Sequence, residues 1–150
     1  MTSAIILAAG PSSRMGQSKQ MLEIQGESLL AKTVRTVIAA RIKHIIVVLG
    51  ANEKAHREIL KDDPVAIVTN PAWKSGMGSS VKAGLKHLPV LDFRIENTVI
   101  LVCDQPLLSS GIISALVSKH NETKKPIVAS GYAGVPGVPV LFHRDYFEEL

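Results

Sequence analysis

The stretch TSAIILAAGPSSRMGQSK, residues Thr2–Lys19, carries the signal that decides the fold. Its first part, Thr2–Ala8, is a short apolar run, and the part that follows is rich in glycine and serine. A short apolar run that ends in a turn signal is typical of a buried strand. We therefore expect a buried first strand followed by a long loop of small residues.

The rest of the chain alternates between strand patterns and helix patterns. Further strands are expected at His44–Leu49, Val65–Thr69, Thr98–Cys103, Ile127–Ser130 and Val138–Phe142. Helices are expected at Ser28–Ala40, Asn52–Leu60, Ser79–His87 and Ser109–Asn121, with Ser28 and Asn52 as caps. Strands that are almost continuously apolar and alternate with helices favour a parallel sheet covered on both faces. The predicted fold class is α/β, a three-layer sandwich with a mainly parallel sheet.

Length and composition limit the class of protein. The 150 residues suffice for one domain, 1–150, and folding would bury about two-thirds of the surface of the unfolded chain. Hydrophobic residues make up 46% of the chain and a single cysteine is present, which excludes a disordered chain and a disulfide framework. Neither a signal peptide nor an apolar run of membrane-spanning length is recognisable, so we expect a cytoplasmic protein.

The charge balance favours a small anionic ligand. There are 17 Lys and Arg residues against 13 Asp and Glu residues, and the basic residues form neither a run nor a helical stripe. Aromatic residues make up only 4% of the chain, so stacking platforms for nucleic acid are not expected. We expect no nucleic-acid partner and no membrane partner.

Three loops follow predicted strands, at the edge where an open parallel sheet binds its ligands: Leu7–Lys19, Asn70–Ser80 and Asp104–Pro106. The first loop combines small residues, which let backbone N–H groups approach phosphate oxygens, with two cations, Arg14 and Lys19. It matches neither the Walker A pattern nor the Gly-x-Gly-x-x-Gly pattern of dinucleotide-binding folds. From the residues alone, an ordinary strand-to-helix connection with surface charges stays equally open.

Asp104 ends an apolar strand, where an unpaired buried carboxylate would be costly. Magnesium needs only one or two protein carboxylates when phosphates supply its other ligands. The alternative is an aspartate that caps the following turn, since Asp-x-Pro is typical turn chemistry. The residues alone do not decide between the two interpretations.

The other candidate residues favour structural roles. Cys103 lies in an apolar strand and is interpreted as a core residue. Trp73 is expected to pack rather than to stack on a base, and the five histidines show no metal-ligand spacing. At the end of the chain, Asp145 is expected to cap a helical turn that begins at Tyr146.

At these loops the sequence resembles the MobA-like NTP transferase domain family, and most closely its molybdenum cofactor cytidylyltransferase branch. The matching segments run through most of the chain: Leu7–Lys19, Asn70–Leu85, Asp104–Pro106 and Ser130–Phe142. Gly137–Phe142 is similar to the family's Gly-x-Pro-Val-Leu-Phe strand. The segments are specific as an ordered set, although each one alone is a weak signal.

The resemblance implies a Rossmann-like, nucleotide-diphospho-sugar transferase-like fold that binds a nucleoside triphosphate and Mg²⁺. Arg14, Lys19 and Asp104 are the implied catalytic residues, and Asp104 is the implied magnesium ligand. The first two would hold the phosphates. The implied nucleotide-binding residues are Leu7, Ala8, Ala9, Gly10, Ser12, Ser13, Arg14, Lys19, Asn70, Gly78, Ser79 and Ser80.

The resemblance also implies an activity. The first loop reads Leu-Ala-Ala-Gly, as in the cytidine branch, where the guanylyltransferase branch typically reads Leu-Ala-Gly-Gly. The implied reaction moves CMP from CTP to the terminal phosphate of molybdopterin cofactor and releases pyrophosphate, in the service of a molybdoenzyme client. Alternatives are another NTP transferase, using GTP or a sugar or polyol phosphate, and a non-catalytic accessory protein that binds nucleotide. Family members continue to an acidic Gly-Asp-x-Gly segment after the position of Leu150, so we expect this chain to be truncated at its C-terminus.

Overall fold

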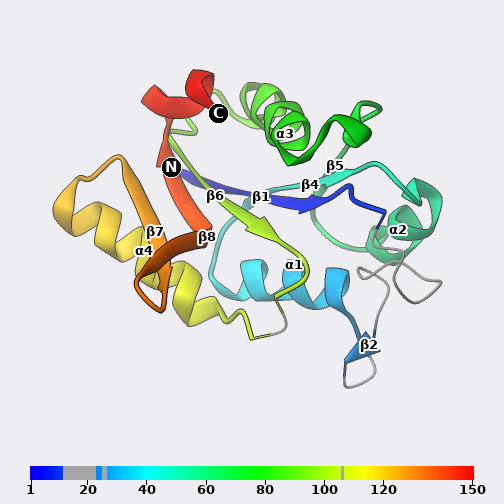
Figure 1. Ribbon diagram of the computed structural model, residues 1–150, viewed down its shortest axis with the longest axis horizontal. Helices are drawn as coiled ribbons and strands as arrows, with labels where there is room; N and C mark the ends of the chain where they lie inside the picture. Colours follow the sequence, from blue (N-terminus) through cyan, green and yellow to red (C-terminus); the bar gives the residue numbers. More distant parts are fainter. Residues whose placement is uncertain (12–22, 25–26, 106) are drawn as a thin grey trace.

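The computed structural model describes residues 1–11, 23–24, 27–105 and 107–150. A six-stranded sheet, in the order β5-β4-β1-β6-β8-β7, lies between two layers of helices (Figure 1). Its strands are β1 Thr2–Ala8, β4 His44–Leu49, β5 Ala66–Thr69, β6 Asn97–Val102, β7 Ile127–Tyr132 and β8 Val135–His143. The predicted three-layer α/β architecture is confirmed.

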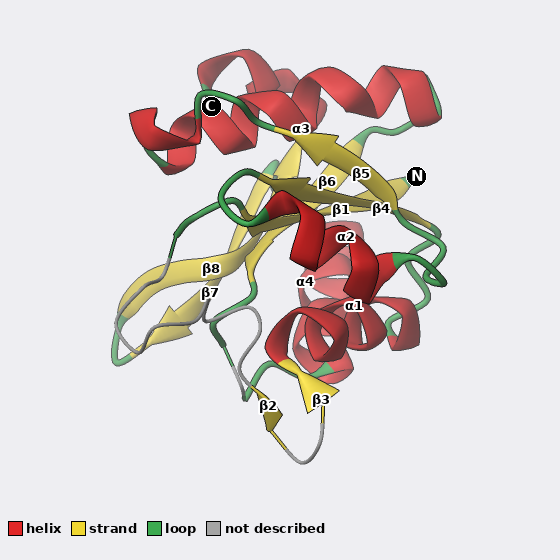
Figure 2. Cartoon of the chain, turned by 90° about the vertical axis from the view of Figure 1, so that its right-hand side faces the viewer, coloured by secondary structure: helices red, strands yellow, loops and turns green. Residues whose placement is uncertain are grey.

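The two faces of the sheet carry different helices (Figure 2). One face is covered by α1 Leu29–Ala39, α2 Glu53–Leu60 and α4 Ser110–Thr123. The other is covered by α3 Met77–Leu91 and by the 3₁₀ helix η3 Arg144–Glu149. A second 3₁₀ helix, η2 Trp73–Ser75, precedes α3, and a small hairpin of β2 Glu23–Ile24 and β3 Glu27–Ser28 precedes α1. That hairpin was not among the elements predicted from the sequence.

The direction of the strands changes at one side of the sheet. β1, β4, β5 and β6 are parallel to one another, whereas β8 is antiparallel to β6 and β7 is antiparallel to β8. The link between the last two strands is a tight hairpin turn. Ala133 and Gly134 both have positive φ there, 49° and 80°, a conformation that matches the right-handed twist of an antiparallel hairpin.

The core follows from the alternation of side chains along β1. Ala4, Ile6 and Ala8 pack toward α1 and α4, while Ile5 and Leu7 pack toward α3. Successive side chains of a strand point to opposite faces, so a strand that is apolar throughout can be buried on both. This explains why the central strands do not alternate between apolar and polar residues.

The helix ends confirm some predicted caps and correct others. Ser28 Oγ accepts a hydrogen bond from the amide of Ala31 at 3.1 Å, as a cap of α1 should. The prediction for Asn52 is wrong, because its backbone is left-handed, with φ of 58°, and its side chain makes no capping bond; a capping residue normally has an extended backbone. The prediction for Asp145 is wrong too, since its own amide donates to His143 Nδ1 at 3.4 Å and η3 begins at Arg144.

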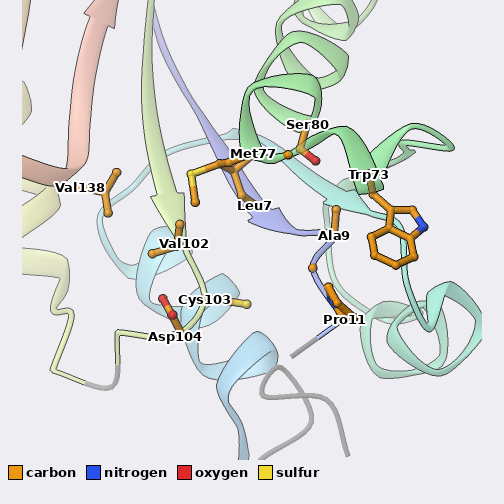
Figure 3. A pocket seen from close by; sticks show the side chains of 12 residues that line it. Leu7, Ala9, Pro11, Trp73, Met77, Ser80, Val102, Cys103, Asp104 and Val138 are labelled. Atoms are coloured by element: carbon orange, nitrogen blue, oxygen red, sulfur yellow. The ribbon is translucent and has the colours of Figure 1, made fainter. Parts of the chain in front are cut away.

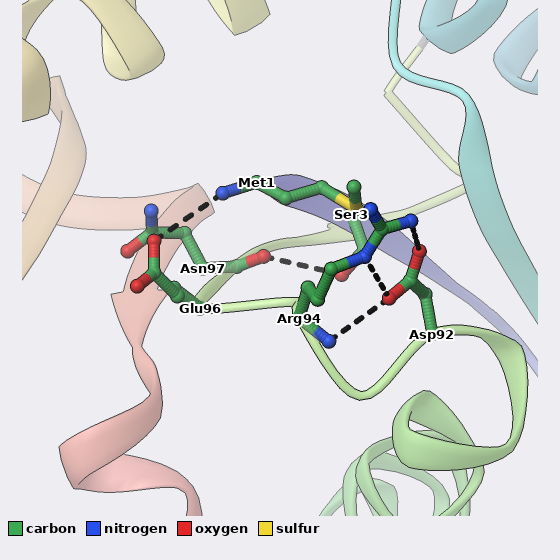
Figure 4. A network of polar contacts seen from close by, with 6 residues as sticks. All are labelled: Met1, Ser3, Asp92, Arg94, Glu96 and Asn97. Carbon is green, nitrogen blue, oxygen red and sulfur yellow. Dashed lines mark hydrogen bonds and ion pairs between the residues drawn. The ribbon is translucent and has the colours of Figure 1, made fainter.

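Polar contacts close the edge of the sheet where β1 and β6 begin (Figure 4). The amino group of Met1 pairs with Glu96 at 3.4 Å, and Arg94 pairs with Asp92 at 2.7 Å. The guanidinium of Arg94 holds the pKa of the Asp92 carboxyl far below its usual range. Charged and polar groups therefore gather at this edge, and a cavity of about 470 Å³ lies at the opposite edge. No helix in the described ranges is both long enough and apolar enough to span a bilayer.

Candidate functional site

A cavity of about 470 Å³ opens at the carboxyl ends of β1 and β6 (Figure 3). Its walls come from the loop after β1, the segment from η2 to the first turns of α3, the end of β6, and β8. The carboxyl edge is where open α/β sheets bind their ligands, because the loops that follow parallel strands meet there. The lining residues are Leu7, Ala9, Gly10, Pro11, Trp73, Gly76, Met77, Ser80, Val102, Cys103, Asp104 and Val138.

The first wall is the end of β1. Leu7 and Ala9 face the cavity, whereas Ala8 lies on the opposite face of the sheet in the core. The carbonyl of Ala9 accepts a hydrogen bond from the amide of Ala51 at 3.0 Å, which ties this wall to the loop after β4. Gly10 and Pro11 continue the wall and are exposed to solvent. Ser12, Ser13, Arg14 and Lys19 follow and lie outside the described residues.

A hydrogen-bond network centred on Asn70 forms the second wall. Asn70 Nδ2 donates to Ser79 Oγ and to Ser80 Oγ, both at 2.9 Å, while Asn70 Oδ1 accepts from the amide of Ala72 at 3.0 Å. Asn70 is buried and uses both ends of its amide on the protein itself. In this structure it therefore holds the start of α3 against the loop after β5, and Ser80 is the member of the network that lines the cavity.

Trp73 packs against the protein, as predicted, and also borders the cavity. Its half-buried ring packs so closely over Gly50 that a Cβ added to this glycine would lie 2.7 Å from the indole. The ring also lines the cavity, and Lys74 Nζ lies 5.5 Å from its centroid. Met77 is 60% exposed on the same wall, so this side offers a largely apolar surface to a ligand.

The third wall is the end of β6, where Asp104 and Cys103 lie (Figure 3). Asp104 is exposed, and within the described part of the chain its carboxylate has no ion-pair partner and accepts no backbone hydrogen bond. The turn-capping alternative therefore finds no bond in the described residues. Cys103 is buried in the core, as predicted.

Burial determines the chemistry of Cys103. Loss of solvation raises the pKa of its thiol to about 12, and the negative charge of Asp104 adds to the effect. A thiol is nucleophilic as the thiolate, so Cys103 stays protonated and inert at neutral pH. The prediction that it is a core residue rather than a nucleophile agrees with this environment.

The fourth wall, on β8, was missed by the sequence analysis as a ligand surface. Val138 lines the cavity, and its carbonyl accepts a hydrogen bond from Gln105 Nε2 at 3.0 Å. The two residues are 33 positions apart in the sequence, and no sequence pattern at either residue predicts the contact. Pro106, between Gln105 and Leu107, lies outside the described residues.

The structure brings together part of the predicted site. Leu7, Ala9, Gly10, Ser80 and Asp104 line one cavity. Ala8, Asn70, Gly78 and Ser79 adjoin those residues in the chain but are not among the lining residues. A part in ligand binding stays a prediction for both groups of residues. Within the described ranges no group of three or more His, Cys, Asp or Glu side chains could hold a metal ion without a ligand's help.

Comparison with known proteins gives a family and a set of relatives. A family model described as the MobA-like NTP transferase domain matches residues 4–150. The nicotine blue oxidoreductase of Paenarthrobacter nicotinovorans is 30% identical, over 91% of this chain and 65% of the relative. The purine catabolism protein PucB of Bacillus subtilis is 30% identical, over 95% and 71%. The molybdenum cofactor cytidylyltransferase of Escherichia coli is 28% identical, over 93% and 69%. The chain thus spans about two-thirds of the length of these curated relatives.

Solved structures share the fold over almost the whole chain. Rv0371c of Mycobacterium tuberculosis is similar with a TM-score of 0.84 at 25% identity, over 99% of this chain and 74% of that one. A complex of the same mycobacterial protein with manganese has a TM-score of 0.79 at 24% identity, over 99% and 73%. The 4-diphosphocytidyl-2C-methyl-D-erythritol synthase of Anaerococcus prevotii has a TM-score of 0.77 at 21% identity, over 99% and 74%. These likenesses confirm the predicted Rossmann-like, nucleotide-diphospho-sugar transferase-like fold.

Proposed function

The chain belongs to the MobA-like NTP transferase domain family, and from that premise we propose that it transfers CMP from CTP to the terminal phosphate of molybdopterin cofactor, with release of pyrophosphate. The proposal draws on the Leu-Ala-Ala-Gly sequence of residues 7–10 and on the likeness to a molybdenum cofactor cytidylyltransferase. A nucleoside triphosphate, a divalent cation and a phosphate-bearing acceptor would then meet in the cavity at the carboxyl ends of β1 and β6.

The observation that carries the proposal is the carboxylate of Asp104. It lies at the end of a buried strand, on the wall of the 470 Å³ cavity, and is exposed there. In the described ranges nothing neutralises its charge and no backbone amide donates to it. A carboxylate left in this state beside a cavity is suited to a cation that arrives with a ligand.

The residues at this site suit a Mg²⁺ ion that would be bound by the protein and by the phosphates of a nucleotide together. Asp104 supplies one carboxylate, and the lack of a three-residue cluster in the described part of the chain means that phosphate oxygens and water would complete the coordination. When bound, such an ion offsets the negative charge that grows on the α-phosphoryl group. One structurally similar protein, Rv0371c of Mycobacterium tuberculosis, has been solved as a complex with manganese, so that protein holds a divalent ion.

The chain's own residues would act by positioning and by charge. A phosphate monoester has a second pKa near 6 and is already anionic at pH 7, so the acceptor needs no general base. This agrees with a cavity whose thiol, Cys103, stays protonated. Arg14 and Lys19 are proposed to hold the β- and γ-phosphates and to stabilise the departing pyrophosphate.

Base choice is assigned to the end of β1 and the start of α3. The Ala9 methyl group, where the guanylyltransferase branch has glycine, would narrow the cavity against a purine. Ser80, already oriented by Asn70 at 2.9 Å, would contribute a hydrogen bond to the base. One methyl group in a pocket changes affinity by about 10- to 200-fold at most.

A pyrophosphate-release assay tests the proposal. The protein is incubated with Mg²⁺, with CTP, GTP or ATP, and with molybdopterin cofactor or a sugar or polyol phosphate as the acceptor. We expect release with CTP and molybdopterin cofactor, a preference for CTP over GTP, and a weaker preference in Ala9→Gly. A preference for GTP, or release with a sugar phosphate alone, would replace the proposed substrates. CTP binding with no release for any acceptor would favour the non-catalytic accessory role.

A further inference from the structure

β6 and β8 separate where the cavity begins. Their antiparallel pairing joins Asn97–Ile100 to residues 140–143, with Ile100 opposite Val140, and ends there. β6 nevertheless runs on to Val102, and both Val102 and Val138 line the cavity (Figure 3). The cavity is therefore bounded on this side by two strands that are no longer hydrogen-bonded to each other.

β8 is also irregular where it faces its other neighbour. Ala129 of β7 pairs with Val140, but the next residue, Ser130, pairs with Gly137, so Val138 and Pro139 have no opposite residue on β7. Two side chains of β7 donate hydrogen bonds to the backbone carbonyls of these two residues. Ser130 Oγ donates to the carbonyl of Pro139 at 2.9 Å, and the hydroxyl of Tyr132 donates to the carbonyl of Val138 at 2.9 Å.

Gln105 crosses the split between the two strands. It directly follows Asp104, and its Nε2 donates to the same carbonyl of Val138 at 3.0 Å. Asp104 itself has no side-chain anchor in the part of the chain that the structure describes, so the described hydrogen bond that ties its loop to the opposite strand comes from the neighbouring residue. The position of the carboxylate is thus coupled to β8 through one amide.

We propose that Gln105 is a positioning residue: by bridging the loop after β6 to the Val138 carbonyl across the split between β6 and β8, it places the Asp104 carboxylate for the nucleotide-bound cation. This inference rests on the proposed function and deepens it, because it assigns a role to a residue that need not touch nucleotide, cation or acceptor. A single protein carboxylate leaves few constraints on the ion, so the orientation of that carboxylate matters more than in a site with several ligands.

The test measures the metal dependence of CTP binding, which needs no turnover. Isothermal titration of the protein with CTP is repeated over a series of Mg²⁺ concentrations. Gln105→Met removes the donor at nearly constant length, and we expect the Mg²⁺ concentration for half-maximal CTP affinity to rise about 10-fold, the lower end of the effect usual for residues that orient metal ligands. Affinity for CTP at saturating Mg²⁺ should stay close to that of the unaltered protein.

Ser130→Ala is the matched control. It removes one side-chain hydrogen bond to the adjacent carbonyl of the same strand, Pro139, without touching the loop of Asp104. We expect it to lower thermal stability about as much as Gln105→Met and to leave the Mg²⁺ dependence unchanged. Gln105→Asn provides a second variant, because it keeps an amide but is one methylene too short to reach Val138. It should shift the Mg²⁺ dependence in the same direction.

Asp104→Asn distinguishes a failure of the proposed cation site from a failure of the positioning role of Gln105. If Asp104→Asn abolishes the Mg²⁺ dependence while both Gln105 variants match Ser130→Ala, the positioning role is overturned and the proposed site stands. If Asp104→Asn leaves the Mg²⁺ dependence unaltered, the proposed cation site and the role of Gln105 are overturned together. Should Gln105→Met fail to fold, the result with Gln105→Asn decides.

Discussion

Cys103 shows how one residue can belong to the core and to the wall of the cavity at once. It ends the apolar segment that includes β6, is 3% exposed, and lies directly before the exposed Asp104. Burial raises its pKa from the ordinary value near 9 to about 12, so the folded protein keeps a proton that the unfolded chain releases. At neutral pH Cys103 is therefore a neutral thiol, which leaves Asp104 as the charged group at this end of the strand.

The raised pKa has a consequence for stability at high pH. Between pH 9 and pH 12 the unfolded chain loses the thiol proton and the folded protein retains it, so stability falls as pH rises through that window and is independent of this thiol below it. Urea unfolding of the unaltered protein and of Cys103→Ser at pH 8 and pH 10 measures the effect. We expect the unaltered protein to lose more stability than the variant, by on the order of 1 kcal/mol. Equal losses would place the thiol in contact with water.

Residue patterns predicted which loops form the site better than they predicted the contacts between those loops. Asp104 could be selected because it stands at the end of an apolar strand pattern, next to a turn signal, whereas Ser80 was implied only by the family resemblance. The contact from Gln105 to the Val138 carbonyl could not be predicted, because a backbone acceptor is the same in every residue and the two partners are 33 positions apart. Arg14 and Lys19 lie outside the described residues, and their phosphate contacts remain predictions.

At the scale of elements, α3 is positioned by a glycine. Gly84 lies against β1 so closely that an added Cβ would be 2.8 Å from Ile5 Cγ2 and 3.3 Å from Val48 Cγ2. The close approach lets α3 lie flat on the sheet with its first turn, which contains Met77 and Ser80, at the cavity. Close packing at Gly84 and the Asn70 hydrogen bonds at the start of α3 thus place the second wall of the cavity together.

Gly84→Ala should destabilise the protein by about 1–3 kcal/mol, because the methyl group has to displace buried branched side chains. Gly78→Ala is the control in the same helix, since a Cβ there meets nothing within 4 Å. We expect that control to be neutral or slightly stabilising, as alanine is the better helix former. Urea unfolding of the two variants measures the difference. Equal stability would mean that α3 does not need the close contact.

Elements with strong local signals were predicted to within a residue or two. β1, β4 and α1 each combine a clear apolar period with a turn or cap residue, and Ser28 caps α1 as expected. The start of α3 was missed by two residues, since Gly78 weakens the helical pattern there. The antiparallel direction of β8 was not predicted, because a strand's apolar pattern is the same in both directions and the pairing partner decides it.

At the scale of the whole molecule, the two edges of the sheet have different roles. The edge where β1 and β6 begin carries the ion pair Met1–Glu96 and, within the loop before β6, the ion pair Arg94–Asp92. The opposite edge holds the cavity, where four chain segments from distant parts of the sequence converge. Alternation of strands and helices predicts this division in general terms, because the loops after parallel strands all end at one edge. The split between β6 and β8, which widens that edge, depends on long-range pairing.

The central claim is that this cavity binds a nucleoside triphosphate together with a divalent cation held by Asp104. Calorimetric titration of CTP into the unaltered protein and into Asp104→Asn, with and without Mg²⁺, tests it most directly, with circular dichroism and thermal unfolding as the check on folding. We predict that Mg²⁺ strengthens CTP binding to the unaltered protein and has no such effect on the equally folded variant. An Asp104→Asn variant whose CTP binding still responds fully to Mg²⁺ would contradict the account.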